Sequence, residues 1–126
     1  MILGTGIDIV KIGRIKKLID RYESGFLKKI FTENEILYCN RKGEPSIHFA
    51  GRWAVKEAFY KALPVEIQQK SGWKSIEIIS DNRGKPFVNV VSEELNELFK
   101  SHLIGKIHTS ISHEREFAIG SIILES

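Results

Sequence analysis

The first 23 residues pass from one hydrophobic pattern to another. Residues 2–10 are rich in Ile and Val, which favours a β-strand that ends near Val10. Apolar positions then recur every three or four residues, a spacing that predicts a helix over residues 12–23. The apolar face of this helix holds Ile12, Ile15, Leu18, Ile19 and Tyr22. Its opposite face is basic and holds Lys11, Arg14, Lys17 and Arg21.

Capping signals mark the next two helices. A short turn-rich segment, residues 24–31, leads to Thr32, and Glu35 follows as in a capping box, so we expect a helix to begin there. A stretch with Gly and Pro breaks that helix. We expect Ser46 to be the N-cap of a long central helix, which Pro64 ends because its ring cannot continue the helical hydrogen bonds.

The second half of the chain begins with a predicted β-hairpin. Residues 73–80 and 86–91 read as strands that flank a polar, Gly-containing turn. Ser92 is expected to cap a helix that runs to about Leu103, with Gly105 just past its end.

Two more strands, residues 106–112 and 117–125, complete the predicted elements as a hairpin in the middle of the sheet. The fold class is therefore α+β, with a mostly antiparallel sheet of about five strands packed against helices. We find no repeat and no linker, so one domain over residues 1–126 is the simplest organisation.

The composition is typical of a soluble globular protein, with 42% hydrophobic and 28% charged residues. Cys39 is the only cysteine, which excludes an intrachain disulfide or a zinc knuckle and favours a reducing compartment. We interpret it as a small, half-buried apolar residue. The apolar N-terminus lacks a basic start and is interrupted by Asp8, and no apolar run is long enough for a membrane span, so we expect a cytoplasmic protein.

The net charge of +3 is unevenly distributed. Residues 1–30 contain seven Lys and Arg against three Asp and Glu, whereas the rest of the chain is slightly acidic. A basic segment suggests an acidic partner, which could be nucleic acid, an anionic membrane or an acidic protein. Charge alone leaves open a solvated helix face without a partner.

The central helix, residues 49–63, combines ten apolar residues with four charged ones. On a helical wheel Glu57 and Lys61 lie within an arc of aromatic and alanine side chains, whereas Arg52 and Lys56 share another side. Buried ions are costly unless each finds partners. One reading is a Glu–Lys pair one turn apart, which stabilises an exposed helix only slightly. The other is a site where Glu57 holds a cation and Lys61 meets an anion such as phosphate.

A second carboxylate for such a site is Asp8. Aspartate is unfavourable within an apolar strand, although a role at a strand end or turn is the alternative. Mg²⁺ commonly takes one or two carboxylates together with phosphates and waters. Asp8, Glu57 and Lys61 therefore make a candidate metal–phosphate site.

Four stretches carry a resemblance to a known family: "GIDIV", "FTENE", "FAGRWAVKEAFYKAL" and "SISHEREFAIGSIILE". In this order, and over nearly the whole chain, they resemble the holo-[acyl-carrier-protein] synthases, the short members of the 4′-phosphopantetheinyl transferase superfamily. The resemblance implies the fold of that superfamily. It also implies transfer of the phosphopantetheine arm of coenzyme A to a serine of apo acyl carrier protein, with release of adenosine 3′,5′-bisphosphate, in support of fatty acid biosynthesis.

The same resemblance implies roles for single residues. Asp8 and Glu57 match the family's Mg²⁺ ligands, and Lys61 matches a lysine that stabilises or protonates the leaving phosphate. A metal-bound water or a carboxylate would take the serine proton. Arg52 and His113 match contacts to the coenzyme A phosphates, with a structural role as the alternative for the histidine. The hairpin turn at which the family seats adenine contains Lys85 and Pro86.

The family resemblance also supplies partners. Acyl carrier protein is acidic and would dock on Arg14 and, around it, on Lys11, Lys17 and Arg21, mainly raising the association rate. The resemblance implies a homotrimer with active sites between subunits. It implies neither nucleic acid nor a membrane as a partner. Residues 64–72 depart from the family's Gly-Thr-Gly loop, so we expect a differently shaped rim there.

Two other classes of protein compete with the transferase. The basic helix favours a small nucleic-acid-binding module, but no aromatic stacking motif accompanies it. The second class is a non-catalytic oligomerising domain in which Glu57 and Lys61 form only a structural pair.

Overall fold

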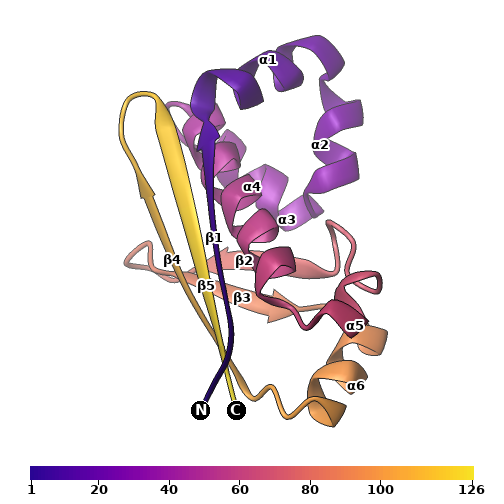
Figure 1. Cartoon of the computed structure of the whole chain (residues 1–126). Helices are drawn as coiled ribbons and strands as arrows, with labels where there is room; N and C mark the ends of the chain where they lie inside the picture. Colours follow the sequence, from indigo (N-terminus) through magenta and orange to yellow (C-terminus); the bar gives the residue numbers. More distant parts are fainter.

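The structure is a computed structural model that describes residues 1–126 (Figure 1). The helices are α1 (Ile12–Tyr22), α2 (Ser24–Ile30), α3 (Glu33–Asn40), α4 (Pro45–Ala62), α5 (Val65–Gln68) and α6 (Glu93–Ser101). The strands are β1 (Ile2–Lys11), β2 (Ile76–Ser80), β3 (Pro86–Val90), β4 (Lys106–His113) and β5 (Phe117–Glu125). The α+β class is confirmed. None of these helices has the length and hydropathy that a membrane span requires.

The five strands are divided between two antiparallel sheets, where we expected one. A three-stranded sheet has the order β1-β5-β4, and β2 pairs only with β3. β5 lies in the middle of the larger sheet as predicted, whereas its hairpin partner β4 forms an edge. β3 runs beside β4 without a hydrogen-bonded ladder between them. The smaller sheet packs on the core through Ile76 and Ile78 of β2, and its hairpin end, hereafter the β2–β3 arm, carries the turn with Lys85 past β4 (Figure 1).

Glycines allow α4 to lie directly on the larger sheet. A Cβ atom on Gly6 of β1 would lie 1.9 Å from the carbonyl oxygen of Ala58, and one on Gly120 of β5 would lie 2.5 Å from the backbone nitrogen of Val55. No side chain fits at either position. Because Asp8 follows Gly6 by two residues, this close approach also brings Asp8 up to α4.

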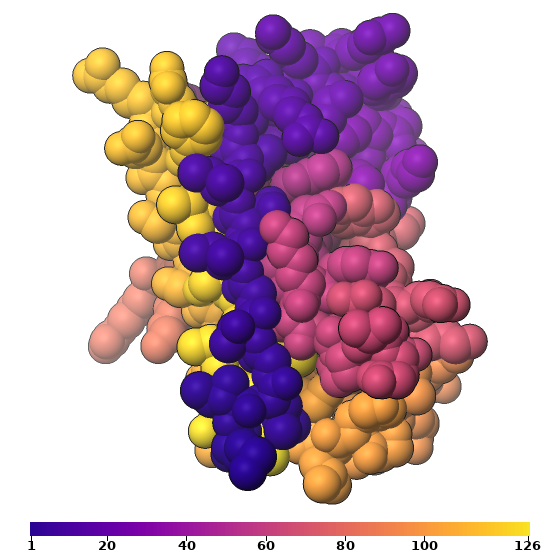
Figure 2. All heavy atoms as spheres, in the orientation of Figure 1, coloured from indigo at the N-terminus to yellow at the C-terminus, as the bar shows by residue number.

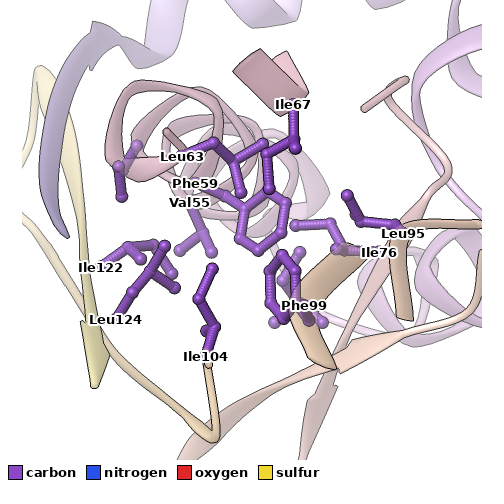
Figure 3. Packing of buried hydrophobic residues seen from close by; sticks show 13 residues of the cluster. Val55, Phe59, Leu63, Ile67, Ile76, Leu95, Phe99, Ile104, Ile122 and Leu124 are labelled. Carbon is purple, nitrogen blue, oxygen red and sulfur yellow. The ribbon is translucent and has the colours of Figure 1, made fainter. Parts of the chain in front are cut away.

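Buried apolar residues form two clusters that share α4. The larger joins α4 to α5, α6, β2 and β5, with Val55, Phe59, Phe99 and Leu124 among its members (Figure 3). The second joins α4 to α1, α2 and α3 and includes Cys39, which is fully buried. Cys39 is thus an apolar packing residue, as expected, but it is more deeply buried than expected, and burial raises the pKa of its thiol to about 12.

The predicted capping residues are confirmed at two helices. Thr32 and Glu35 form a reciprocal capping box at α3, and the Ser92 hydroxyl accepts a hydrogen bond from the backbone N–H of Leu95 at α6. Ser46 is not an N-cap, because α4 already begins at Pro45. A proline is well suited to the first turn of a helix, where its missing N–H has no partner to lose.

Two other expectations about helices are wrong. The segment described as turn-rich forms α2, separated from α1 only by Glu23 with φ 49°. At the end of α6 the left-handed conformation is adopted by Leu103, with φ 60°, and not by Gly105. Neither Glu23 nor Leu103 is a glycine, the residue type that usually signals a positive φ in a sequence.

Candidate active site

The four charges of the central helix lie in two different environments. Arg52 and Lys56 are buried, with 3% and 4% of their surface exposed, whereas Glu57 is half-buried and Lys61 is exposed. The expectation that Glu57 and Lys61 are the embedded pair is therefore wrong for a single chain. Small and apolar residues of α4 face the larger sheet, and the face with Glu57 and Lys61 is left open beside β1.

β1 and α4 bring three of the predicted site residues together. The Lys61 ammonium lies 3.0 Å from Asp8 Oδ1 and donates a second hydrogen bond of 3.1 Å to the carbonyl of Ile7. Burial and the nearby Asp8 carboxylate raise the pKa of Glu57, while Lys61 and Arg14 act against this shift. Asp8, Glu57 and Lys61 thus form one cluster, hereafter the acid–lysine cluster.

The donor set of this cluster fits a hard divalent cation that is shared with a substrate. It offers two carboxylates, and no third Asp, Glu, His or Cys joins them. Zinc sites in proteins normally need three or four protein ligands. Mg²⁺ instead accepts one or two carboxylates and fills its remaining positions with water and phosphate oxygens. A cation would also relieve the repulsion between Asp8 and Glu57 that raises the glutamate's pKa.

A basic hollow of about 570 Å³ lies at one end of the molecule. It is lined by all four predicted basic residues of the α1 region together with the β4–β5 turn: Lys11, Gly13, Arg14, Lys17, Leu18, Arg21, Arg115 and Glu116. The sequence did not indicate Arg115 as a site residue, because its stretch "HERE" predicts only a turn. Arg14 connects this hollow to the acid–lysine cluster, since its charge also acts on Glu57.

Arg52 forms a second cationic centre on another side of α4. Its guanidinium lies 4.0 Å from the centre of the Tyr38 ring and donates a hydrogen bond of 3.1 Å to Ser80 Oγ. The Nε atom of Arg52 is buried without a hydrogen-bond partner. Lys42 lies 4.6 Å from the same ring. A buried guanidinium with an unused donor is suited to bind an anion.

The predicted residue His113 lies near this second centre. Burial lowers the pKa of His48 on α4, and the charges of Lys42, Arg52 and His113 lower it further. The charges of Lys42, Arg52 and His113 thus all act on His48. We call Arg52, Lys42, His48 and His113 the arginine centre.

One chain does not bring all the predicted substrate-binding residues together. Arg52 precedes Glu57 by five positions, so the two side chains leave α4 in directions about 140° apart. Lys85 and Pro86 lie on the β2–β3 arm, where the Lys85 N–H donates to Asp81 Oδ1 and Pro86 pairs with Ser80. The acid–lysine cluster and the arginine centre are therefore separate within the chain.

A further hollow, of about 440 Å³, opens beside Glu57. Its lining comes from α4 and the loop before β2: Lys56, Glu57, Phe59, Tyr60, Ser71, Gly72, Trp73 and Ile76. In place of a Gly-Thr-Gly loop, the chain after Pro64 forms the short helix α5 and then returns along this hollow. In this chain the rim after Pro64 thus contains one short helical turn, α5.

Comparisons with known proteins identify the family. The family model for the 4′-phosphopantetheinyl transferase superfamily matches residues 4–120. Holo-[acyl-carrier-protein] synthases from Protochlamydia amoebophila and Syntrophus aciditrophicus are 41% and 40% identical to the chain, covering 100% and 99% of it and 100% and 97% of their own lengths.

Solved structures give the same result for the fold. The synthase from Neisseria meningitidis superimposes with a TM-score of 0.85 at 28% identity, over 100% of both chains. The synthase from Bacillus anthracis, solved in complex with CoA (3′,5′-ADP), gives a TM-score of 0.80 at 36% identity and covers 100% of this chain and 98% of its own.

Proposed function

The chain belongs to the 4′-phosphopantetheinyl transferase superfamily, and from this premise we propose that it has holo-[acyl-carrier-protein] synthase activity. It transfers the 4′-phosphopantetheine arm of coenzyme A to a serine of apo acyl carrier protein and releases adenosine 3′,5′-bisphosphate. The observation that carries this proposal is the acid–lysine cluster, in which Lys61 lies 3.0 Å from Asp8 beside Glu57. The relatives' names and the coenzyme A complex of the Bacillus anthracis synthase support it.

Asp8 and Glu57 would hold Mg²⁺, the proposed cofactor, between β1 and α4. A cation held there would supply charge neutralisation for the pyrophosphate of coenzyme A, which is the main requirement of phosphoryl transfer. Two carboxylates leave most of the coordination sphere for phosphate oxygens and water. The serine hydroxyl would attack the β-phosphorus and lose its proton to a carboxylate or a water. The bond from the β-phosphorus to the bridging oxygen would break, and this oxygen would leave on the α-phosphate of adenosine 3′,5′-bisphosphate.

Lys61 is suited to meet the leaving phosphate. An ammonium has three hydrogens, and here two of them are donated to Asp8 and to the Ile7 carbonyl. The third is free, and half of the side-chain surface is exposed. Asp8 and Ile7 thus hold the ammonium in place while one donor remains for the negative charge that grows on the leaving group.

A second copy of the chain would complete the site, and we propose a homotrimer with active sites between subunits. β1 is an edge strand that exposes four large apolar side chains, Ile2, Leu3, Ile7 and Ile9. Figure 2 shows β1 uncovered along the middle of one face, between β5 and α4. Long apolar edges are normally covered by another chain. Such packing would bring the arginine centre of one subunit to the acid–lysine cluster of another, so that both act on one coenzyme A.

The basic hollow is the proposed docking surface for the carrier protein. Its lysines and arginines would attract an acidic partner from a distance, which raises the association rate more than the final affinity. Arg14 lies between the hollow and Glu57, so docking there places the carrier's serine close to the acid–lysine cluster. The reaction would supply carrier protein for fatty acid biosynthesis in the cytoplasm, where the free thiol of Cys39 stays reduced.

Charge reversal at Arg14 tests the docking surface. We expect Arg14→Glu to raise the KM for apo carrier protein about tenfold while the KM for coenzyme A changes less than about twofold. Lys100→Glu is the matched control, since Lys100 is exposed on α6, far from α1. Steady-state kinetics with each substrate varied in turn makes the measurement. Equal changes in both KM values would contradict the basic hollow as the docking surface for the carrier protein.

The activity itself is tested by intact-mass spectrometry of apo acyl carrier protein incubated with this protein, coenzyme A and Mg²⁺. The expected result is a mass gain of one phosphopantetheine arm, absent with EDTA and absent with Glu57→Gln. No gain with a carrier protein that another transferase modifies would overturn the proposed function. Binding to DNA or RNA that weakens steeply with salt would then favour the nucleic-acid-binding alternative.

A further inference from the structure

Lys56 and Glu35 form an ion pair inside the molecule. The Lys56 ammonium lies 3.0 Å from Glu35 Oε1, and the two side chains are 1% and 0% exposed. Glu35 also accepts the backbone N–H groups of Thr32 and Ile78, each at 2.8 Å. Besides Lys56, the partners of this carboxylate are thus two backbone N–H groups, one at the start of α3 and one in β2.

Lys56 gives its other two hydrogens to backbone carbonyls. It donates to the carbonyl of Trp73 at 2.6 Å and to that of Ile76 at 3.0 Å. These are the only side-chain hydrogen bonds between α4 and residues 71–76 in the structure. Lys56 is thus the one side chain that hydrogen-bonds this loop to α4, beside the apolar packing of Trp73 on Trp53.

This point is directly beside the proposed catalytic residues. Lys56 precedes Glu57 in α4, and both line the 440 Å³ hollow, whose opposite wall includes Gly72, Trp73 and Ile76. The Trp73 ring packs against that of Trp53, with centroids 4.6 Å apart. The position of the loop therefore decides both the width of the hollow next to Glu57 and the distance between the two indoles.

We propose that Lys56 is a positioning residue for coenzyme A: its bonds to the Trp73 and Ile76 carbonyls hold the loop against α4 and keep the hollow beside Glu57 at its working width. This role rests on the proposed function. It does not depend on the ion pair as such, because an amine keeps two hydrogens for the two carbonyls whatever happens to Glu35. The loop after α5 has no other side-chain hydrogen bond to α4, so its polar attachment to the helix depends on Lys56.

Two single variants separate this role from stability. Lys56→Met and Glu35→Gln both destroy the same buried ion pair, but only the first removes the bonds to the loop. We expect Lys56→Met to raise the KM for coenzyme A about tenfold, as the loss of two charge-assisted hydrogen bonds implies. Glu35→Gln should leave that KM within about twofold, and the KM for carrier protein should stay within about twofold in both variants.

A spectroscopic measurement follows the loop without any substrate. Two indoles this close and tilted by 31° give an exciton couplet in far-ultraviolet circular dichroism, and Trp53→Phe identifies the band of this pair. The couplet should be lost in Lys56→Met and kept in Glu35→Gln. Should Lys56→Met not fold, the double variant with Glu35→Gln, which leaves no unpaired buried charge, is expected to give the same loss and the same rise in KM.

An unchanged couplet and KM in Lys56→Met, or equal changes in both single variants, would overturn the positioning role. Inactivity of the unaltered protein would instead refute the proposed function, and the circular dichroism comparison would still decide whether Lys56 holds the loop.

Discussion

Lys56 and Glu57 are neighbours in α4, but they differ in burial and in their bonding partners. Lys56 is buried and fully bonded, and Glu57 is half-buried with a raised pKa beside Asp8. Sequence reasoning identified Glu57 because a glutamate among aromatic residues is unusual, but it did not find the partner of Lys56. Glu35 already had an explanation as a capping residue, and only the structure shows that one carboxylate caps α3 and neutralises a lysine of α4.

The raised pKa of Glu57 means that its charge destabilises the fold. In the folded chain Glu57 keeps its proton to higher pH than in the unfolded chain, so its contribution to stability falls as pH rises through the raised pKa. We expect Glu57→Gln to have an equal or higher Tm than the unaltered protein at pH 7. The difference should vanish below about pH 4, where the unfolded glutamate is also protonated. Thermal unfolding across this pH range makes the measurement.

The same variant should lose transfer activity by about 100-fold or more, since a charge that stabilises the transition state is gone. Mg²⁺ should raise the Tm of the unaltered protein and not that of Glu57→Gln. Glu66→Gln, at an exposed position of α5, is the control and should change neither property. A lower Tm and full activity in Glu57→Gln would show that Glu57 is only a structural partner of Lys61.

At the scale of elements, periodicity predicted most helices and strands, and it failed where a boundary depends on a single dihedral angle. Glu23 lets α2 follow α1 directly, and a glutamate at positive φ gives no sequence signal. Alternation likewise predicted each hairpin but could not tell which strands share a sheet, since that depends on how α4 and the larger sheet approach one another. Gly6 and Gly120 set this approach, and in the sequence they look like ordinary interruptions of strands.

Gly6→Ala measures how closely α4 and β1 are packed. The new methyl group would lie 1.9 Å from the Ala58 carbonyl oxygen, so the variant should lose at least about 2 kcal/mol of unfolding free energy. Gly13→Ala is the matched control, because nothing lies within 4 Å of its Cβ position in α1, and it should gain about 0.5–1 kcal/mol. Urea unfolding compares the two. A neutral Gly6→Ala would mean that α4 and β1 separate more easily than the structure indicates.

For the whole molecule, the important feature is that one chain keeps the acid–lysine cluster and the arginine centre apart. The family resemblance assigned five residues to one active site: Asp8, Glu57, Lys61, Arg52 and His113. A resemblance does not say which subunit supplies each residue. The structure places the first three on one side of α4 and Arg52 on another, with the β2–β3 arm projecting beyond both. The exposed apolar strand β1 is the surface on which copies would meet.

Mixing two inactive variants tests whether sites are shared. Asp8→Asn removes the acid–lysine cluster, and Arg52→Met removes the arginine centre. Each should be inactive alone, and after dissociation and reassembly as an equal mixture they should recover roughly a quarter of the original activity, because that share of interfaces combines two intact halves. Reassembly of each variant by itself is the control. A mixture that stays inactive would place the complete site within one chain.

The two ends of the chain lie side by side. The Ser126 N–H donates to the Met1 carbonyl at 3.0 Å, and the N-terminal ammonium donates to the Ser126 hydroxyl at 3.1 Å. Figure 1 shows this meeting point at the opposite end of the molecule from α1. A tag, a fluorophore or a surface attachment at either terminus therefore points away from the basic hollow, and a short peptide is long enough to close the backbone into a ring.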